Sequence, residues 1–170
     1  MSSGPGARPP AAPPRWLAPT IVVGILVLDQ LTKSWVVATR SDSPLSIIGD
    51  DVQINLTRNS GGAFSLFTNA TVVLAILAIG LSIFLVRAVH QARDWLTVVA
   101  LSMVLGGALG NLTDRIVRSP GFLRGHVVDF VQVGTFPTFN VADSAITIGA
   151  ILLVIAAFRE SSRTPNEHPA

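Results

Sequence analysis

The chain has 170 residues, of which 49% are hydrophobic and 13% are charged, and its mean hydropathy is +0.57, which favours an integral membrane protein over a soluble domain. Its net charge is only +2 and its basic residues are scattered, so no nucleic-acid partner is expected. It contains no cysteine, which excludes disulfides, thiolate metal sites and a cysteine nucleophile.

The N-terminal part of the chain combines a polar tail with a first hydrophobic segment. Residues 1–15 are rich in proline, glycine, alanine and serine and predict a disordered tail. Residues 16–39 predict a transmembrane helix that carries Asp29 and Lys33. A cleaved signal peptide is the alternative for this segment, but its internal charges and the lack of a small-residue cleavage site disfavour that interpretation.

Three further segments, at residues 70–89, 95–112 and 141–158, are also apolar. Each is long enough to cross about 30 Å of hydrocarbon at about 1.5 Å per residue. The sequence therefore predicts an all-α membrane protein, with a four-helix transmembrane domain over residues 16–158 and a C-terminal tail over residues 159–170. Four crossings put both termini on one side of the membrane.

The side on which the termini lie is predicted from the basic residues. Their total numbers on the two sides are nearly equal, but the short turn at residues 87–94 concentrates two arginines and a histidine beside the membrane. Because basic loops remain in the cytoplasm, we expect both termini to be cytoplasmic.

A loop of about thirty residues separates the first two segments. Val52, Ile54 and Leu56 alternate with polar residues and predict a strand, so we expect a small extracytoplasmic β element between helices 1 and 2. Gly61 and Gly62 lead to the hypothesis that the loop at residues 40–69 is a lid over a substrate.

Asn59 and Gly61 belong to the sequence Asn-Ser-Gly-Gly in this loop. Glycines let the backbone turn tightly and present N–H groups, and the amide of Asn59 can both donate and accept hydrogen bonds. These residues therefore form either an ordinary turn or part of a binding site.

Asp29 and Lys33 are spaced i, i+4 and share one helix face, so they can neutralise each other as a structural ion pair. A lysine could instead activate a serine nucleophile. No serine of the chain lies in a recognisable nucleophile motif.

The third segment ends in small and polar residues. Gly106 and Gly110 form a face that allows close helix packing. Asn111, Asp114 and Arg115 share another face, where Arg115 could bind a carboxylate or a substrate carbonyl through two hydrogen bonds. Asp114 is expected to anchor the end of the helix.

Two aspartates flank the start of the last segment. Asp129 interrupts an apolar stretch, while Asn140 and Asp143 have the spacing of a capping box at the start of a helix. Charged groups at membrane depth cost a few kcal/mol and generally indicate function. Two adjacent carboxyl groups that share one proton can activate water for attack on an amide.

Other functions remain open on this evidence. A proton-coupled transporter would use the acids as a relay, and a non-enzymatic membrane assembly factor would use them as caps. A metal hydrolase could use Asp129, Asp143 and His126, although the sequence contains no recognised metal-binding motif. We expect no metal and no cofactor.

The chain resembles the lipoprotein signal peptidases, also called signal peptidase II, in five motifs that occur in the family's order. They are Asp29-Gln30-x-Thr32-Lys33, Asn59-x-Gly61-x-Ala63-Phe64, Gly106-Gly107-Ala108-x-Gly110-Asn111-x-x-Asp114-Arg115, Val128-Asp129-Phe130 and Phe139-Asn140-x-Ala142-Asp143. One departure is the segment at residues 131–139, which is shorter than in many members.

The resemblance implies a monomeric aspartyl endopeptidase of the bacterial inner membrane, with its active site on the extracytoplasmic side. It would cleave prolipoproteins before a diacylglyceryl-modified cysteine, in contact with membrane lipid, and would bind inhibitors similar to globomycin. Asp129 and Asp143 would be catalytic. Residues that hold substrate or orient the dyad would be Asn59, Gly61, Asn111, Arg115 and Asn140, and structural support would come from Asp29, Lys33 and Asp114.

Overall fold

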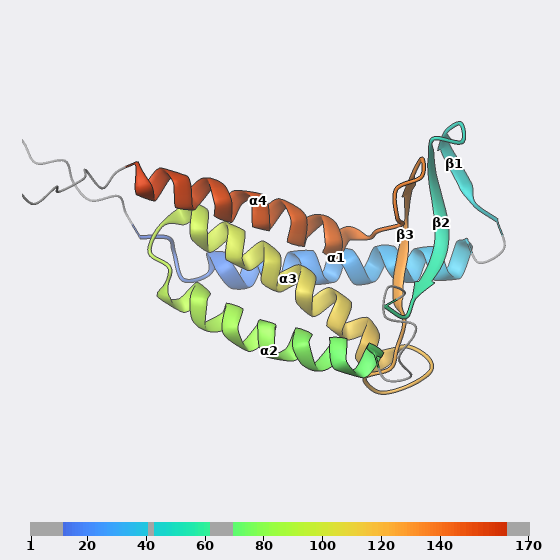
Figure 1. Cartoon of the computed structure of the whole chain (residues 1–170), viewed down its shortest axis with the longest axis horizontal. Coiled ribbons are helices and arrows are strands. Elements are labelled where there is room, and N and C mark those ends of the chain that lie inside the picture. The colour runs from blue at the N-terminus through green and yellow to red at the C-terminus, as the bar shows by residue number, and fades with distance from the viewer. Residues whose placement is uncertain (1–11, 41–42, 62–69, 163–170) are drawn as a thin grey trace, which may run out of the picture.

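The computed structural model describes residues 12–40, 43–61 and 70–162 (Figure 1). Its four helices are α1 (Leu17–Thr39), α2 (Ala70–Gln91), α3 (Trp95–Val117) and α4 (Val141–Ser161). All four are long and apolar enough to cross a membrane, which confirms the predicted fold class. Most of the N-terminal tail, residues 41–42 and 62–69 of the proposed lid and most of the C-terminal tail lie outside the described residues.

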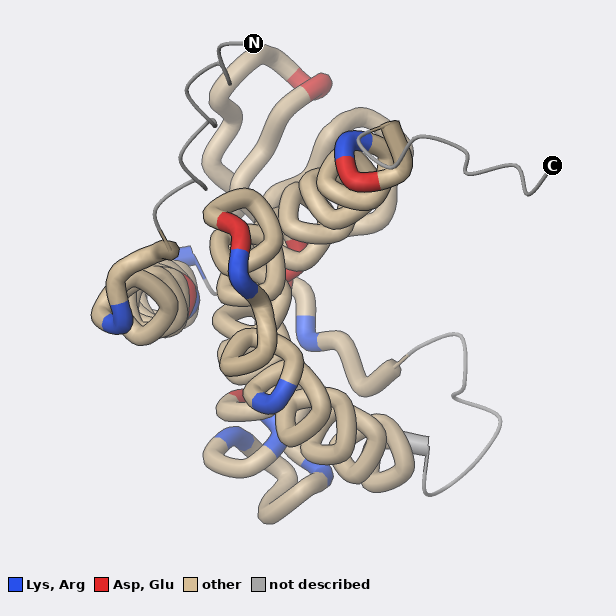
Figure 2. The backbone as a smooth tube through the Cα atoms, turned by 90° about the vertical axis from the view of Figure 1, so that its left-hand side faces the viewer, with Lys and Arg blue, Asp and Glu red and all other residues tan. Residues whose placement is uncertain are grey.

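Helix α3 is the centre of the bundle and packs against α1, α2 and α4 (Figure 2). The glycines in its second half permit this close packing. A methyl group added to Gly107 would lie 2.4 Å from the backbone oxygen of Ala142 in α4, and one added to Gly106 would lie 3.0 Å from Ile25 in α1. The predicted small-residue face therefore lies where the neighbouring helices approach.

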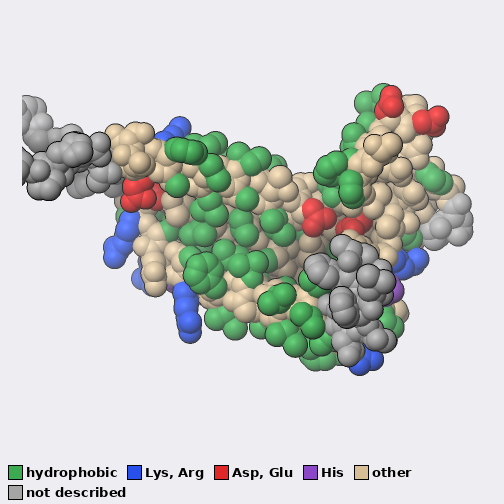
Figure 3. Space-filling view, viewed as in Figure 1, with side chains coloured by type: hydrophobic (Ala, Val, Ile, Leu, Met, Phe, Trp, Pro, Cys, Tyr) green, Lys and Arg blue, Asp and Glu red, His purple; other side chains and the backbone are tan. Residues whose placement is uncertain are grey.

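The helices present hydrophobic side chains to their surroundings, and the basic residues gather toward the ends of the bundle (Figure 3). α3 begins at Asp94, whose side chain accepts a hydrogen bond of 2.8 Å from the backbone N–H of Thr97. α4 begins with the predicted capping box of Asn140 and Asp143. Both helices thus start at residues that satisfy their free backbone donors.

A three-stranded antiparallel sheet lies at the end of the bundle where α1 and α3 terminate (Figure 1). It consists of β1 (Leu45–Ile48), β2 (Val52–Asn59) and β3 (Val127–Val133), in that order. β1 and β2 form the predicted β element between the first two helices. β3 was not predicted, because it lies between α3 and α4 and its apolar sequence has no alternation.

The boundaries of the helices also differ from the prediction, most of all at the C-terminal ends of α3 and α4. α3 continues to Val117 instead of ending at residue 112, and α4 continues to Ser161. The polar side chains of Asn111 and Asp114 therefore lie within α3. They do not break the helix because other buried side chains and backbone groups form hydrogen bonds with them.

Candidate active site

Asp129 occupies the middle of β3, opposite Thr57 of β2, and is only 2% exposed. Its Oδ2 accepts a hydrogen bond of 3.0 Å from Nδ2 of Asn59, and its Oδ1 accepts one of 2.6 Å from Nδ2 of Asn140. The pairing of β2 with β3 and the start of α4 thus bring two amide donors to one carboxyl group.

Asp143 lies in the first turn of α4. Its Oδ1 accepts a hydrogen bond of 2.8 Å from Nδ2 of Asn111 in α3, and its Oδ2 accepts one of 3.2 Å from the backbone N–H of Asn140. A carboxylate at the start of a helix is stabilised by the free N–H groups and by the helix dipole.

The side chain of Asn140 joins these two aspartates. Its Nδ2 donates to Asp129, to Oδ1 of Asn111 at 3.2 Å and to the backbone oxygen of Val128 at 3.3 Å, while its Oδ1 accepts from the backbone N–H of Asp143 at 2.9 Å. Asn140 is completely buried. The two acids, which are 14 residues apart in the sequence, are therefore held by one rigid amide group.

The electrostatic environment of Asp129 favours its protonated form. Burial is the largest influence and raises its pKa, and the negative charge of Asp143 raises it further. The hydrogen bonds from Asn59 and Asn140 act in the opposite direction, and the resulting pKa is about 6. A carboxyl group with this pKa keeps its proton to a higher pH than an ordinary aspartate does.

Lys33 lies beneath the two acids and is completely buried. Its Nζ lies 2.8 Å from Oδ2 of Asp29, 2.8 Å from Oδ2 of Asp114 and 2.9 Å from Oδ1 of Asn111. The predicted pair of Asp29 and Lys33 is thus part of a larger cluster. Asn111 also donates a hydrogen bond to Asp143, so its amide side chain connects the ammonium group of Lys33 to that acid.

Asp114 lies in the last turn of α3, where its side chain contacts Arg118 at the end of that helix and also β3. Its Oδ2 accepts a hydrogen bond of 3.1 Å from the backbone N–H of Val128, and its Oδ1 forms an ion pair of 2.6 Å with Nε of Arg118. Asp29 has a similar role, because its Oδ1 accepts from the backbone N–H of Ala142 at 3.0 Å. These two acids attach β3 and the start of α4, the elements that carry the central aspartates, to α3 and α1.

Sequence reasoning assigned no role to Gln30 or Arg118. Nε2 of Gln30 lies 3.1 Å from Oδ2 of Asp29, 3.1 Å from the backbone oxygen of Gly110 and 3.2 Å from Oδ1 of Asp114. The i, i+4 spacing of Asp114 and Arg118 is a signal that could have revealed their ion pair. The contacts of Gln30 depend on the packing of α1 against α3 and have no local signal.

Arg115 interacts electrostatically with Asp129, and Gly61 is connected to Asp129 through Asn59. Nη1 of Arg115 is buried and has no hydrogen-bond partner among the described residues, and its charge interacts with Asp114 and Asp129. Gly61 has a φ of 96° and donates its backbone N–H to Oδ1 of Asn59 at 2.8 Å. This bond orients the amide of Asn59 so that its Nδ2 faces Asp129.

The groups that a serine–lysine or metal hydrolase would need are not brought together in the described part of the chain. Within residues 12–40, 43–61 and 70–162, Lys33 forms no hydrogen bond with a serine, and no three acidic or histidine side chains could hold a metal ion. His126 borders a separate cavity of about 440 Å³ together with Arg58 and Arg118.

Comparison with known proteins decides the family. The sequence model of signal peptidase (SPase) II matches residues 21–159, which include all the residues of the site. The chain belongs to the signal peptidase II family. It is therefore a membrane peptidase, and the expected resemblance is confirmed.

The relatives of this signal peptidase II chain span most of its length. It is 46% identical over 155 residues to the lipoprotein signal peptidase of Rhodococcus jostii (strain RHA1). The matched region covers 90% of this chain and 78% of the relative. The chain is 46% identical over 159 residues to the lipoprotein signal peptidase of Mycobacterium tuberculosis (strain ATCC 25618 / H37Rv), and this match covers 91% and 78%. A solved bacterial membrane enzyme is 32% identical with a TM-score of 0.77, covering 86% of this chain and 96% of that one.

Proposed function

We propose that the protein is an aspartyl endopeptidase that removes the signal peptides of bacterial prolipoproteins by cleaving before a diacylglyceryl-modified cysteine. The observation that carries the proposal is the pair of Asp129 and Asp143, joined by the side chain of Asn140. The names of the relatives support the substrate class, because they are lipoprotein signal peptidases.

In the proposed mechanism, Asp143 is the base and Asp129 holds the proton. Asp143 accepts hydrogen bonds from Asn111 and from the backbone at the start of α4, and burial favours the neutral form of Asp129. Asp143 takes a proton from water as the water oxygen attacks the amide carbon, and Asp129 gives its proton to the carbonyl oxygen. Asp143 then gives its proton to the leaving nitrogen while the tetrahedral intermediate returns a hydroxyl proton to Asp129, and the C–N bond breaks to give the acid and the amine.

The position of the dyad suits a substrate that arrives from the membrane. Asp129 lies on the sheet at the end of the bundle, beside the start of α4. A signal helix and two acyl chains can approach sideways through lipid, while water reaches the acids from the adjacent aqueous side. The free Nη1 of Arg115 is suited to bind a backbone carbonyl of the substrate, or of a cyclic peptide inhibitor similar to globomycin.

The proposed location is the bacterial inner membrane, with both termini in the cytoplasm and the dyad toward the extracytoplasmic side. The basic turn between α2 and α3 favours this orientation. The site is formed by one chain, so we propose that the monomer is active.

The test is cleavage of a purified diacylglyceryl-modified prolipoprotein by the wild type and by the Asp129→Asn and Asp143→Asn variants. Each variant should lose about 10²–10⁴-fold in rate, because each removes one acid–base group. Asp51→Asn, which changes an exposed acid of the β1–β2 turn, is the matched control and should cleave normally. Thermal unfolding of each protein shows that it is folded.

Several results would contradict the proposal. Normal cleavage by Asp129→Asn or Asp143→Asn would show that the substituted aspartate is not catalytic. Loss of wild-type cleavage on addition of EDTA would indicate a metal hydrolase instead. Failure of the folded wild type to cut an authentic lipidated substrate would favour the transporter or assembly function.

A further inference from the structure

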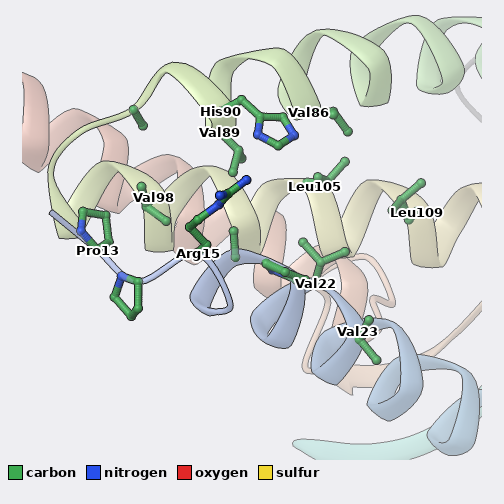
Figure 4. A pocket seen from close by; sticks show the side chains of 14 residues that line it. Pro13, Arg15, Val22, Val23, Val86, Val89, His90, Val98, Leu105 and Leu109 are labelled. Carbon is green, nitrogen blue, oxygen red and sulfur yellow. The ribbon is translucent and has the colours of Figure 1, made fainter.

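A groove separates α1 from α2 at the end of the bundle where α1 begins. Both helices pack against α3, and the space between them is a cavity of about 590 Å³ (Figure 4). One wall includes Val22 and Val23 of α1, the other includes Val86 and Val89 of α2, and α3 forms the floor. Apart from Arg15 and His90 near the mouth, the lining residues are all apolar.

The length of the groove corresponds to one leaflet of a bilayer. Its floor extends along α3 from Val98 to Leu109, which is about 16 Å at about 1.5 Å per residue. The hydrocarbon of a bilayer is about 30 Å thick, so the groove runs from the end of the helices to about the middle of the membrane. An acyl chain from that leaflet would lie along it.

The mouth of the groove lies at the depth of the lipid headgroups. Trp16, the N-cap residue of α1, and Trp95, the first residue of α3, are 63% and 46% exposed, as is typical of aromatic residues at a membrane interface. Arg15 and His90 come from opposite walls, and the guanidinium of Arg15 points into the groove (Figure 4). Neither side chain forms an ion pair or hydrogen bond with any residue that the structure describes.

We propose that this groove binds one anionic phospholipid, with its phosphate on Arg15 and His90 and one acyl chain between α1 and α2. An arginine fork matches the geometry of phosphate oxygens, and the histidine adds a donor from the opposite wall. A free phosphate ion would leave the apolar part of the groove unused. The inference depends on the membrane-spanning fold and not on the proposed peptidase activity.

Charge argues against a signal peptide as the occupant, because a signal peptide begins with positive charges that Arg15 would repel. The anionic headgroup of a phospholipid complements the mouth instead.

The proposed lipid links two helices that are otherwise connected through α3. Because it binds only the folded arrangement, it should stabilise the protein in proportion to its concentration. Phosphatidylglycerol should therefore raise the unfolding temperature of the purified protein in detergent more than phosphatidylcholine with the same acyl chains. Native mass spectrometry should detect one retained phosphatidylglycerol.

The experiment compares the wild type with two groove variants and one control. Arg15→Gln/His90→Gln removes the headgroup contacts and should reduce the preference for phosphatidylglycerol by about tenfold. Val23→Trp fills the groove from α1 and should weaken the retention of both lipids. Arg87→Gln is the matched control, because Arg87 lies on α2 near His90 but does not line the groove, and it should retain the wild-type preference.

The proposal fails if the double variant retains the wild-type preference for phosphatidylglycerol, or if Arg87→Gln loses as much. It also fails if inorganic phosphate displaces phosphatidylglycerol, which would indicate an anion site without a role for the acyl chain. Displacement of the lipid by a synthetic signal peptide would make the substrate helix the occupant. Cleavage activity is measured separately and does not decide between these outcomes.

Discussion

Because the pKa of Asp129 is raised in the folded protein, we expect the free energy of unfolding to depend on pH. Because its pKa is about 6 in the folded protein and 3.8 in the absence of its neighbours, the folded state holds a proton that the unfolded chain has already released over this range. The free energy of unfolding should therefore fall by about 2.5 kcal/mol as the pH rises from 4 to 7. The contribution is fully present only well below pH 3.8 and is lost as the pH rises through 6.

Unfolding curves of the wild type and of Asp129→Asn across this pH range measure the effect. The amide cannot ionise, so the stability of the wild type relative to the variant should decrease with rising pH. Titrating groups that do not interact with Asp129 are common to both proteins and cancel in the difference. A constant difference between pH 4 and 7 would contradict the assigned pKa of Asp129.

A second prediction concerns Lys33, whose ammonium group lies between two buried carboxylates. Lys33→Met should lower the free energy of unfolding by about 3–5 kcal/mol, because Asp29 is then left buried without a cation. Asp114 retains Arg118. Chemical unfolding of the purified variant in detergent measures the loss.

Two comparisons test this explanation. Arg124→Met removes an exposed basic residue and should change stability by no more than about 0.5 kcal/mol. Asp29→Asn/Lys33→Met should be less destabilised than Lys33→Met alone, since it leaves no unpaired charge on Asp29. Equal losses in the single and double variants would show that the ion pair is not the cause.

At the scale of single residues, the sequence predicts those contacts that depend on local spacing along the chain. The pair Asp29 and Lys33 and the cap of Asn140 and Asp143 lie within one turn of a helix, so their geometry follows from the sequence. The contact of Lys33 with Asn111 joins α1 to α3, and no local pattern contains it. The family resemblance identified both residues without indicating that they touch.

At the scale of the elements, the packing of α3 against α4 depends on Gly107. A methyl group there would lie 2.4 Å from the backbone oxygen of Ala142, one residue before Asp143. Gly107→Ala should therefore move the start of α4, lower the stability by about 1–3 kcal/mol and reduce the cleavage rate. The unfolding temperature and the rate measure the two effects.

Gly80 in α2 is the matched control, because nothing lies within 4 Å of an added methyl group. Gly80→Ala should be neutral or should stabilise the protein by up to about 1 kcal/mol, since alanine restricts the unfolded chain. If the two variants behave alike, helix propensity and not the approach of α4 determines the effect.

Where each element finds its backbone hydrogen bonds explains which elements could be predicted from the sequence. The transmembrane helices follow from length and hydropathy, because a helix satisfies its own backbone in lipid. β3 satisfies its backbone by pairing with β2, about 70 residues earlier in the chain. Its sequence, Val-Val-Asp-Phe-Val, is buried on both faces at its start and therefore lacks the alternation of a half-exposed strand.

At the scale of the whole molecule, the predicted orientation depends on few charges and needs a direct test. The chain contains no cysteine, so a single introduced thiol reports one position without background. Asp50 lies in the exposed turn between β1 and β2, and Gln91 is the exposed last residue of α2 at the opposite end of the bundle. An impermeant maleimide should label Asp50→Cys but not Gln91→Cys in intact spheroplasts, and the reverse in inverted membrane vesicles. The cysteine-free wild type should remain unlabelled in both. The opposite pattern would place the termini outside and the dyad toward the cytoplasm, where secreted prolipoproteins would not reach it.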